Sequence, residues 1–230
     1  FSEVTTFTGN IATGNTVKDF KGICQGSSCV TISVDSLSIG QRGSTNGGDC
    51  DSVGTWVPNT GSEGGTCTLS KDIQITGNVD GIWLDAHGVT LDGEGHTVTG
   101  NLRTVDTHLD QNYVGVQICH QCHTMAIKNL TIENFGQGIR SYTSSGLTIT
   151  GVTVGNIGYV GMKLHNVDSL LLENNIVTSV GVHYPVQVDG NELGIVVYGD
   201  GWPNSSTGVG DGTCTGTGQY VTPSESINAP

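Results

Sequence analysis

A repeat of about 23 residues in the second half of the chain constrains the fold more than any other sequence feature. Gly115, Gly138 and Gly161 are separated by 23 residues each, and each opens a block with one apolar stretch, a turn and two further apolar stretches. Repeats of this length are typical of solenoids, in which a block packs only against its neighbours. We therefore expect a coil of stacked rungs between Gly81 and Gly199.

Apolar and polar residues alternate within each block, as they do in a strand with one buried face. Kinks at Asn129, Gly151 and the adjacent Asn174 and Asn175 separate the later stretches, so each rung should contain three short strands. The columns expected to stack inward are Met125/Leu147/Leu170, Ile127/Ile149/Leu172, Leu130/Val152/Ile176, Ile132/Val154 and Phe135/Ile157/Val180.

Three short strands per turn predict an all-β fold, a single-stranded parallel β-helix. A leucine-rich horseshoe has a similar repeat length, but its return segments are helical or irregular, and this chain has no segment with helical periodicity. We expect N-terminal cap strands and a loop over residues 1–66, the β-helix over residues 67–199, and a polar tail or assembly arm over residues 200–230.

One stretch resembles a known family. Residues 65–100, GTCTLSKDIQITGNVDGIWLDAHGVTLDGEGHTVTG, look like the first rung of the pectin-lyase-like parallel β-helix proteins, which are grouped with periplasmic copper-maturation β-helix proteins, sugar hydrolases and epimerases. The string VTLDGEGHTVTG carries most of the resemblance, which extends to about residue 198. It implies a right-handed coil. It assigns no activity, because the family mixes enzymes, binding proteins and surface proteins.

The charge balance narrows the classes of partner. The chain has 8 Lys and Arg against 21 Asp and Glu, and a net charge of −13. Nucleic acids and anionic membranes require clustered basic residues, so neither is expected as a partner. No apolar stretch approaches the length of a membrane span. The first residue is Phe1, as in a chain that has lost its signal peptide, and we expect a secreted, extracellular or cell-surface protein.

Seven cysteines in a chain rich in Gly, Ser and Thr favour an oxidising compartment. Candidate disulfides join Cys24 to Cys29 and Cys50 to Cys67, and the odd number leaves at least one thiol over, for which Cys214 is the candidate.

The string Cys119-His120-Gln121-Cys122-His123 has the Cys-x-x-Cys-His spacing of a c-type haem attachment site. Cys119 and Cys122 would bond to the haem and His123 would bind its iron. His165 lies two rungs along in the same column and is the candidate second axial ligand. Two alternatives stay open: a tight disulfide or buried thiols, and a Cys/His metal site that uses His120 or His123.

Two other sets of residues could bind ligands. Arg140 and Lys163 fall in one outward column, where two like charges would suit an anionic ligand such as a haem propionate or an acidic sugar. A side loop over residues 101–112 interrupts the repeat and is a candidate recognition loop. Its charged residues are Asp106, His108 and Asp110.

Two further patterns have simpler readings. Residues Asp85, His87, Asp92, Glu94 and His96 could be read as a metal or acid/base site, but the string DGEG favours turn chemistry. Asn129 and Asn204 match the N-glycosylation pattern, and Asn204 is the better acceptor because it lies in an open loop.

These features together favour a secreted, non-catalytic surface or filament-forming protein that self-assembles and carries one haem for electron transfer. The alternative is a β-helix that binds or cleaves polysaccharide. No repeated Asp cluster of the hydrolase kind is present, and the best residues for such chemistry would be Asp106, His108, Asp110, Arg140 and Lys163.

Overall fold

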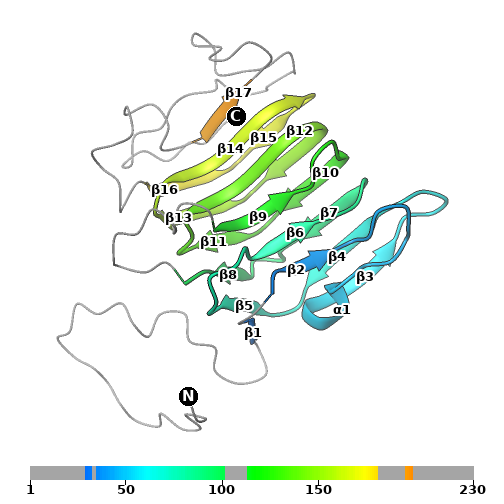
Figure 1. Cartoon of the computed structure of the whole chain (residues 1–230), viewed down its shortest axis with the longest axis horizontal. Coiled ribbons are helices and arrows are strands. Elements are labelled where there is room, and N and C mark those ends of the chain that lie inside the picture. Colours follow the sequence, from blue (N-terminus) through cyan, green and yellow to red (C-terminus); the bar gives the residue numbers. More distant parts are fainter. Residues whose placement is uncertain (1–28, 33–34, 102–112, 181–194, 199–230) are drawn as a thin grey trace, which may run out of the picture.

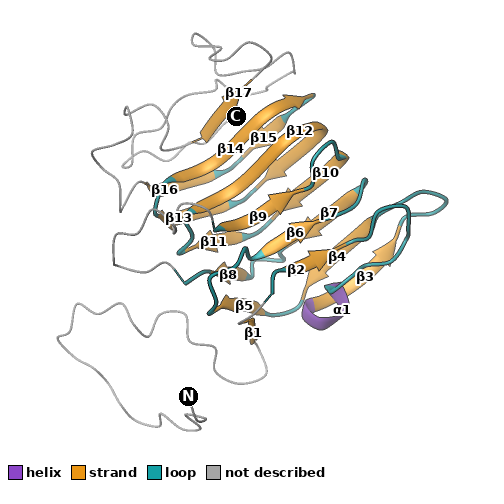
Figure 2. Cartoon of the chain, viewed as in Figure 1, coloured by secondary structure: helices purple, strands orange, loops and turns teal. Residues whose placement is uncertain are grey.

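The computed structural model describes residues 29–32, 35–101, 113–180 and 195–198. Its strands wind around one axis and form three faces, each made of parallel strands from successive rungs, as the repeat predicted (Figure 1). Almost every described element is a strand (Figure 2). In the described part, no helix is long and apolar enough to cross a membrane.

The three faces take their strands from successive rungs. Face 1 contains β2 (Leu37–Ile39), β6 (Ile82–Leu84), β9 (Val114–Ile118), the first half of β12 (Gln137–Thr150), β14 (Val160–Asp168) and β17 (Ile195–Tyr198). Face 2 contains β4 (Gly65–Leu69), β7 (Val89–Asp92), β10 (His123–Lys128), the second half of β12 and β15 (Leu171–Glu173). Face 3 contains β1 (Cys29–Ile32), β5 (Asp72–Ile75), β8 (Thr97–Thr99), β11 (Thr131–Glu133), β13 (Thr153–Ile157) and β16 (Ile176–Val180).

The N-terminal end of the coil has a different construction. The short helix α1 (Cys50–Val53) leads into β3 (Gly54–Pro58), which pairs antiparallel with β4. A disulfide joins Cys50 to Cys67 and fastens this segment to face 2, so that predicted disulfide is confirmed. Parallel pairing already begins with β1 and β2, ahead of the Cys67 start that the repeat suggested. Cys24 and Cys214 lie outside the described residues.

Aliphatic side chains fill the interior in the expected columns. Met125 pairs with Leu147, and Ile149 pairs with both Ile127 and Leu172. All of these side chains are buried. Burial of apolar surface against the rungs above and below is what stabilises such a coil.

One residue that was expected to point into the core does not. The register pairs Ile176 with Thr153, so Ile176 points outward and is 37 % exposed. Asn175 takes the inward place beside Val152 instead. Its side chain accepts the backbone N–H of Val152 at 2.9 Å and donates to the carbonyl of Ile149 at 2.7 Å. Because both polar ends of the amide have partners, the corner can bury an asparagine.

The kinks that separate faces 2 and 3 have left-handed backbone conformations. Asn129, Gly151 and Asn174 have φ values of 52°, 63° and 53°. Asparagine and glycine tolerate this region better than other residues, which explains why they recur there. The kinks expected at these positions are confirmed.

The repeated glycines lie where neighbouring rungs and faces approach closely. A Cβ atom at Gly138 would overlap the carbonyl oxygen of Gly161 and the side chain of Val154. A Cβ atom at Gly115 would likewise overlap Ile132 and crowd the carbonyl of Gly138. Close approach of the faces, and not a turn, therefore explains the 23-residue glycine period.

Candidate functional site

The corner between faces 1 and 2 contains two cysteines, Cys119 and Cys122, and two histidines, His87 and His123. The residue at which face 2 begins has a positive φ in several successive rungs. These residues are Gly64, Gly88, Thr124, Gly146 and Ser169. Threonine is unusual there, because a β-branched side chain is strained at positive φ.

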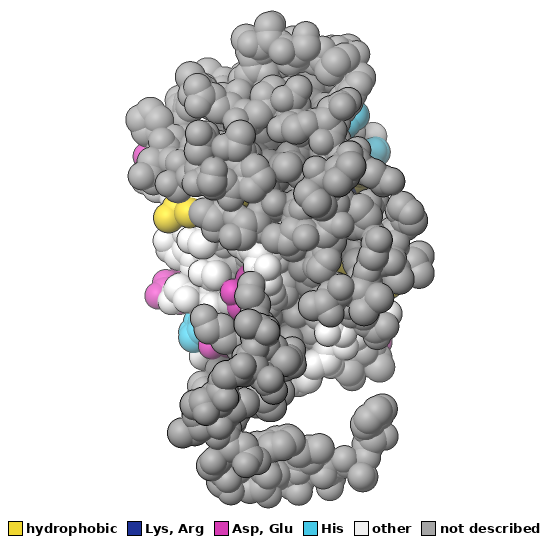
Figure 3. Space-filling model, turned by 90° about the vertical axis from the view of Figure 1, so that its left-hand side faces the viewer, with side chains coloured by type: hydrophobic (Ala, Val, Ile, Leu, Met, Phe, Trp, Pro, Cys, Tyr) yellow, Lys and Arg dark blue, Asp and Glu magenta, His cyan; other side chains and the backbone are white. Residues whose placement is uncertain are grey.

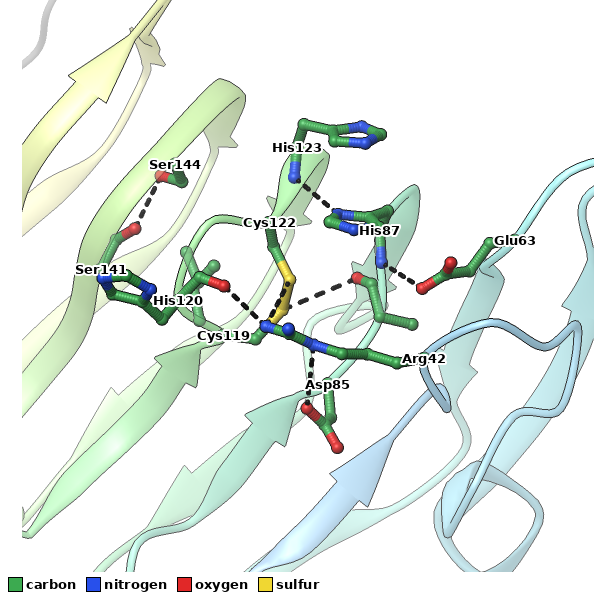
Figure 4. Close-up of a disulfide and its surroundings, with 12 residues drawn as sticks. Arg42, Glu63, Asp85, His87, Cys119, His120, Cys122, His123, Ser141 and Ser144 are labelled. Carbon is green, nitrogen blue, oxygen red and sulfur yellow. Dashed lines mark hydrogen bonds and ion pairs between the residues drawn. A yellow bond between two sulfur atoms is a disulfide. The ribbon is translucent and has the colours of Figure 1, made fainter.

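The residues that precede this turn form an outward column of Glu63, His87 and His123. The imidazole rings of His87 and His123 stack with their centroids 3.9 Å apart and their planes 8° apart. The backbone N–H of His123 donates to Nδ1 of His87 at 3.2 Å, and the backbone N–H of His87 donates to Oε1 of Glu63 at 3.0 Å. Figure 4 shows this column beside the disulfide.

The Glu63 carboxylate is stabilised in its charged form. Burial would raise its pKa, but hydrogen bonds from the backbone of His87 and Gly43 and the nearby charges lower it, and the net pKa lies below the usual value. The column therefore begins with an anion next to an imidazole.

Cys119 and Cys122 are joined by a disulfide on the inner side of the corner, and both residues are buried. Of the alternatives that the sequence left open, the structure contains the disulfide. Each of the two thioether bonds to a haem needs a free thiol, so the sulfurs could accept a haem only after reduction of the disulfide. Haem attachment stays a prediction. The turn is one residue longer than those of the next two rungs, as expected. Five residues separate Gln117 from His123, whereas four separate Arg140 from Ser145, the residues paired with them in the next rung.

Arg42 reaches this turn from the loop between β2 and α1. Its Nη2 donates to the carbonyl of His120 at 2.6 Å and lies 3.6 Å from Sγ of Cys122. Its Nε is 3.8 Å from Oδ1 of Asp85. The N-terminal segment thus contacts the Cys-x-x-Cys turn directly (Figure 4).

The corresponding corner of the next rung closes without a covalent bond. The hydroxyl groups of Ser141 and Ser144 are hydrogen-bonded at 2.7 Å, and both residues are buried. The coil therefore forms this corner with a hydrogen bond as well as with a disulfide.

The carboxylates and histidines of the DGEG region do not converge. Asp92 pairs with Nζ of Lys128 at 2.8 Å, and His96 pairs with Asp72 at 3.1 Å on another corner. Asp85 and His87 have the separate partners described above. Turn chemistry was the interpretation that the sequence favoured for this region. The sequence named His87 only as part of this group, and its proximity to His123 could not be read from the repeat.

The remaining predicted site residues lie apart from this corner or outside the described part. Tyr142 occupies the rung between Cys119 and His165, and its ring centroid is 5.9 Å from that of His165. Asn129 donates from its amide to Asp92 at 3.2 Å. Asn204 and the side-loop residues Asp106, His108 and Asp110 lie outside the described residues.

The structure as described does not assemble a metal site. Within residues 29–32, 35–101, 113–180 and 195–198, no three His, Cys, Asp or Glu side chains are arranged to hold a metal ion. The rings of His87 and His123 stack on each other, and the sulfur atoms of Cys119 and Cys122 are bonded to each other.

Comparison with protein families adds a decisive finding. Residues 31–198 match the family model described as periplasmic copper-binding protein (NosD). The chain belongs to this family. No curated protein and no solved structure matches the chain. The match spans the three-faced coil described above, including the Cys-x-x-Cys corner.

Proposed function

We propose that this protein is an exported, non-catalytic β-helix of the NosD family that holds a copper(I) ion at the Cys119–His123 turn when its disulfide is reduced. The observation that carries the proposal is that three donor residues lie within one turn, namely the buried Cys119 and Cys122 and the exposed His123. Thiolates and imidazoles are the ligands that copper(I) prefers. The family description names copper and the periplasm, which supports both the metal and the compartment.

The donor set fits copper only in the dithiol state. Reduction by an external dithiol breaks the S–S bond and adds two electrons and two protons, which leaves two free thiols on the turn that ends at His123. His123 is exposed, while Nδ1 of His87 already accepts a backbone N–H. His123 is therefore the imidazole ligand, and the stacked His87 ring restricts its orientation.

Copper binding can be measured on the full chain in both redox states. Protein reduced and freed of reductant should take a single copper(I) ion per chain from a chromophoric chelator in ascorbate, and the disulfide form should take far less. Cys122→Ser and His123→Gln should each lower the copper(I) affinity of the reduced protein by about tenfold or more. His96→Gln is the matched control, because this ring pairs with Asp72 on a different corner. Equal copper uptake by all variants, or none by the reduced chain, would refute the proposal.

A covalently attached haem at the same turn is the second candidate. The Cys-x-x-Cys-His spacing is intact, and His120, Gln121 and His123 are exposed, so the turn is accessible from solvent. A native preparation should then show a Soret band and a haem mass that survives denaturation, and electron transfer would be its role. A colourless protein with the mass of the bare polypeptide would reject the haem.

Self-assembly through the termini is a separate proposal. Its support is the polar composition of both ends and the odd number of cysteines. Sedimentation of the chain with and without residues 199–230 tests it. A monomer at high concentration in both cases would count against assembly.

A further inference from the structure

The loop between β2 and α1 crosses three successive rungs at the corner between faces 1 and 2. On the first rung, the backbone N–H of Gly64 donates to the carbonyl of Ser44 at 3.2 Å. On the second rung, Nε of Arg42 lies 3.8 Å from Oδ1 of Asp85. On the third rung, Nη2 of Arg42 donates to the carbonyl of His120 at 2.6 Å. The non-repeating N-terminal segment is therefore attached to the coil along this corner.

Both contacts of Arg42 on the third rung are with the turn that the disulfide closes. Nη2 bonds the carbonyl of His120 and lies 3.6 Å from Sγ of Cys122 (Figure 4). His120 lies between Cys119 and Cys122 in the sequence, so the place of its carbonyl depends on how the S–S bond holds the turn. The position of the Arg42 guanidinium is thereby coupled to the state of the disulfide.

Reduction of this disulfide requires the turn to rearrange. Cys119 and Cys122 are both buried, and protein interiors are close-packed. Two thiols need more room than the disulfide they replace, because sulfur atoms that are no longer bonded must separate to van der Waals contact. The turn can provide this room, since it has one residue more than the turn of the next rung, and His120 and Gln121 are exposed. The movement falls on the residues that hold Arg42.

The coil itself does not depend on this covalent bond. The next corner is closed by a hydrogen bond between the hydroxyl groups of Ser141 and Ser144, and it also delivers its chain into face 2 in register. Loss of the S–S bond should therefore leave β9 and β10 in place. It should displace only the turn and the groups that are attached to it.

We infer that the Cys119–Cys122 disulfide is a redox switch: the bonded form holds Arg42 on the coil, and reduction releases this side chain and loosens the loop around it. An external dithiol supplies two electrons and two protons and is itself oxidised to a disulfide, while two S–H bonds replace the S–S bond of the protein. The remaining ion pair with Asp85 is exposed and too weak to hold Arg42 alone. The switch operates without copper or haem.

Cleavage by trypsin after Arg42 tests the switch on the full chain. Gln41, Arg42 and Gly43 are exposed, so the protease can reach this peptide. Trypsin must take the arginine side chain into its own specificity pocket, which requires the guanidinium to leave the turn. The protein is reduced with a dithiol, separated from it without air and compared with the disulfide form in the presence of a copper chelator. We expect cleavage after Arg42, followed by mass, to become about tenfold faster or more on reduction, because hydrogen bonds of a charged group are lost.

Two controls assign the change to this disulfide. Cleavage after Lys128, at the end of β10, should stay slow in both states, because the coil keeps its register. The double variant Cys119→Ser/Cys122→Ser retains the Cys50–Cys67 disulfide and lacks the switch. Its cleavage after Arg42 should therefore not change with reduction.

Three results would overturn the inference. The first is cleavage after Arg42 at an unchanged or lower rate in the reduced wild-type protein. The second is an equal response of the serine double variant, since the release would then come from another disulfide. The third is fast cleavage after Lys128 on reduction, which would mean that the coil unfolds instead of switching locally. Copper is absent throughout, so a failure of the proposed copper site would leave all three results unaffected.

Discussion

The Cys119–Cys122 corner and the Ser141–Ser144 corner lie on successive rungs and connect the same two faces. One is closed by a disulfide and the other by a hydrogen bond between hydroxyl groups. Both deliver the chain into face 2 in register, with His123 beside Ser145 and Met125 beside Leu147. The inward columns therefore determine the path of the corners, and the side chains at a corner are free to serve another purpose.

The interior should be far more sensitive than either corner. Ile149→Asp would bury a carboxylate between Ile127 and Leu172, at a cost of several kcal/mol, and should unfold the central rungs. Thr148→Asp changes the adjacent, partly exposed side chain of the same strand and should be mild. Chemical denaturation monitored by circular dichroism measures both variants. Wild-type stability of Ile149→Asp would mean that the register is wrong.

The two disulfides whose cysteines both lie in the described part of the chain should contribute unequally to stability. Cys50 and Cys67 are separated by 17 residues, and Cys119 and Cys122 by 3. In the chain-entropy model, replacing both cysteines by serine costs about 3 kcal/mol for the longer loop and about 2 kcal/mol for the shorter. Denaturant midpoints of the two double variants test the order. A larger loss at the Cys119–Cys122 corner would show that this corner does need its covalent bond.

Replacing Thr124, one of the residues with positive φ at the cysteine corner, by glycine should stabilise the fold. Thr124 has a φ of 58°, whereas the matching residue of the next rung is Gly146. Thr124→Gly should stabilise the fold by about 1 kcal/mol, because glycine adopts this conformation without a steric penalty. Thr131→Gly, in the regular strand β11, should destabilise it instead. A loss of thermal stability in Thr124→Gly would indicate that the threonine side chain is needed at the corner.

The smallest expected effect is a dependence of stability on pH at face 2. Burial would raise the pKa of Asp92, but its hydrogen bonds with Lys128, the Glu94 N–H and Asn129 lower it below the usual value. A lowered pKa in the folded state stabilises the fold above the unfolded-state pKa, and this stabilisation disappears as the pH falls through the folded-state pKa. Lys128→Met should reduce that dependence by less than about 1 kcal/mol, because the ammonium group is partly exposed. Unfolding curves from neutral to acidic pH, compared between wild type and variant, provide the measurement.

The coil could be predicted because its rungs are regular from β9 to β16. Glycines at a constant spacing and alternating side chains specified the strands, and only the doubled Asn174 and Asn175 shifted the column assigned to Ile176. The histidine pair could not be predicted in the same way. His87 and His123 are 36 residues apart, because the segment after Gly100 breaks the 23-residue spacing.

The contact from Arg42 had no sequence signal at all. It joins residues 78 positions apart, and it depends on how the non-repeating N-terminal segment folds back over the coil. Periodicity relates equivalent residues of different rungs, so it gives no information about a segment that belongs to no rung. The charge of the surface was easier to anticipate, and Asp and Glu side chains are visible on the described part of the face in Figure 3.

The glycine column also bears on how a gene for such a chain can change in length. Gly115 and Gly138 each face the carbonyl of the equivalent glycine one rung later, so one rung meets another through the same contact each time. A duplication of 23 codons would carry its own glycine, kink and inward set, and the copy would join at both ends as its parent did. A duplication that moved another residue into the glycine column would place a side chain against that carbonyl. Inheritance by whole rungs is therefore one route by which this architecture can grow or shrink.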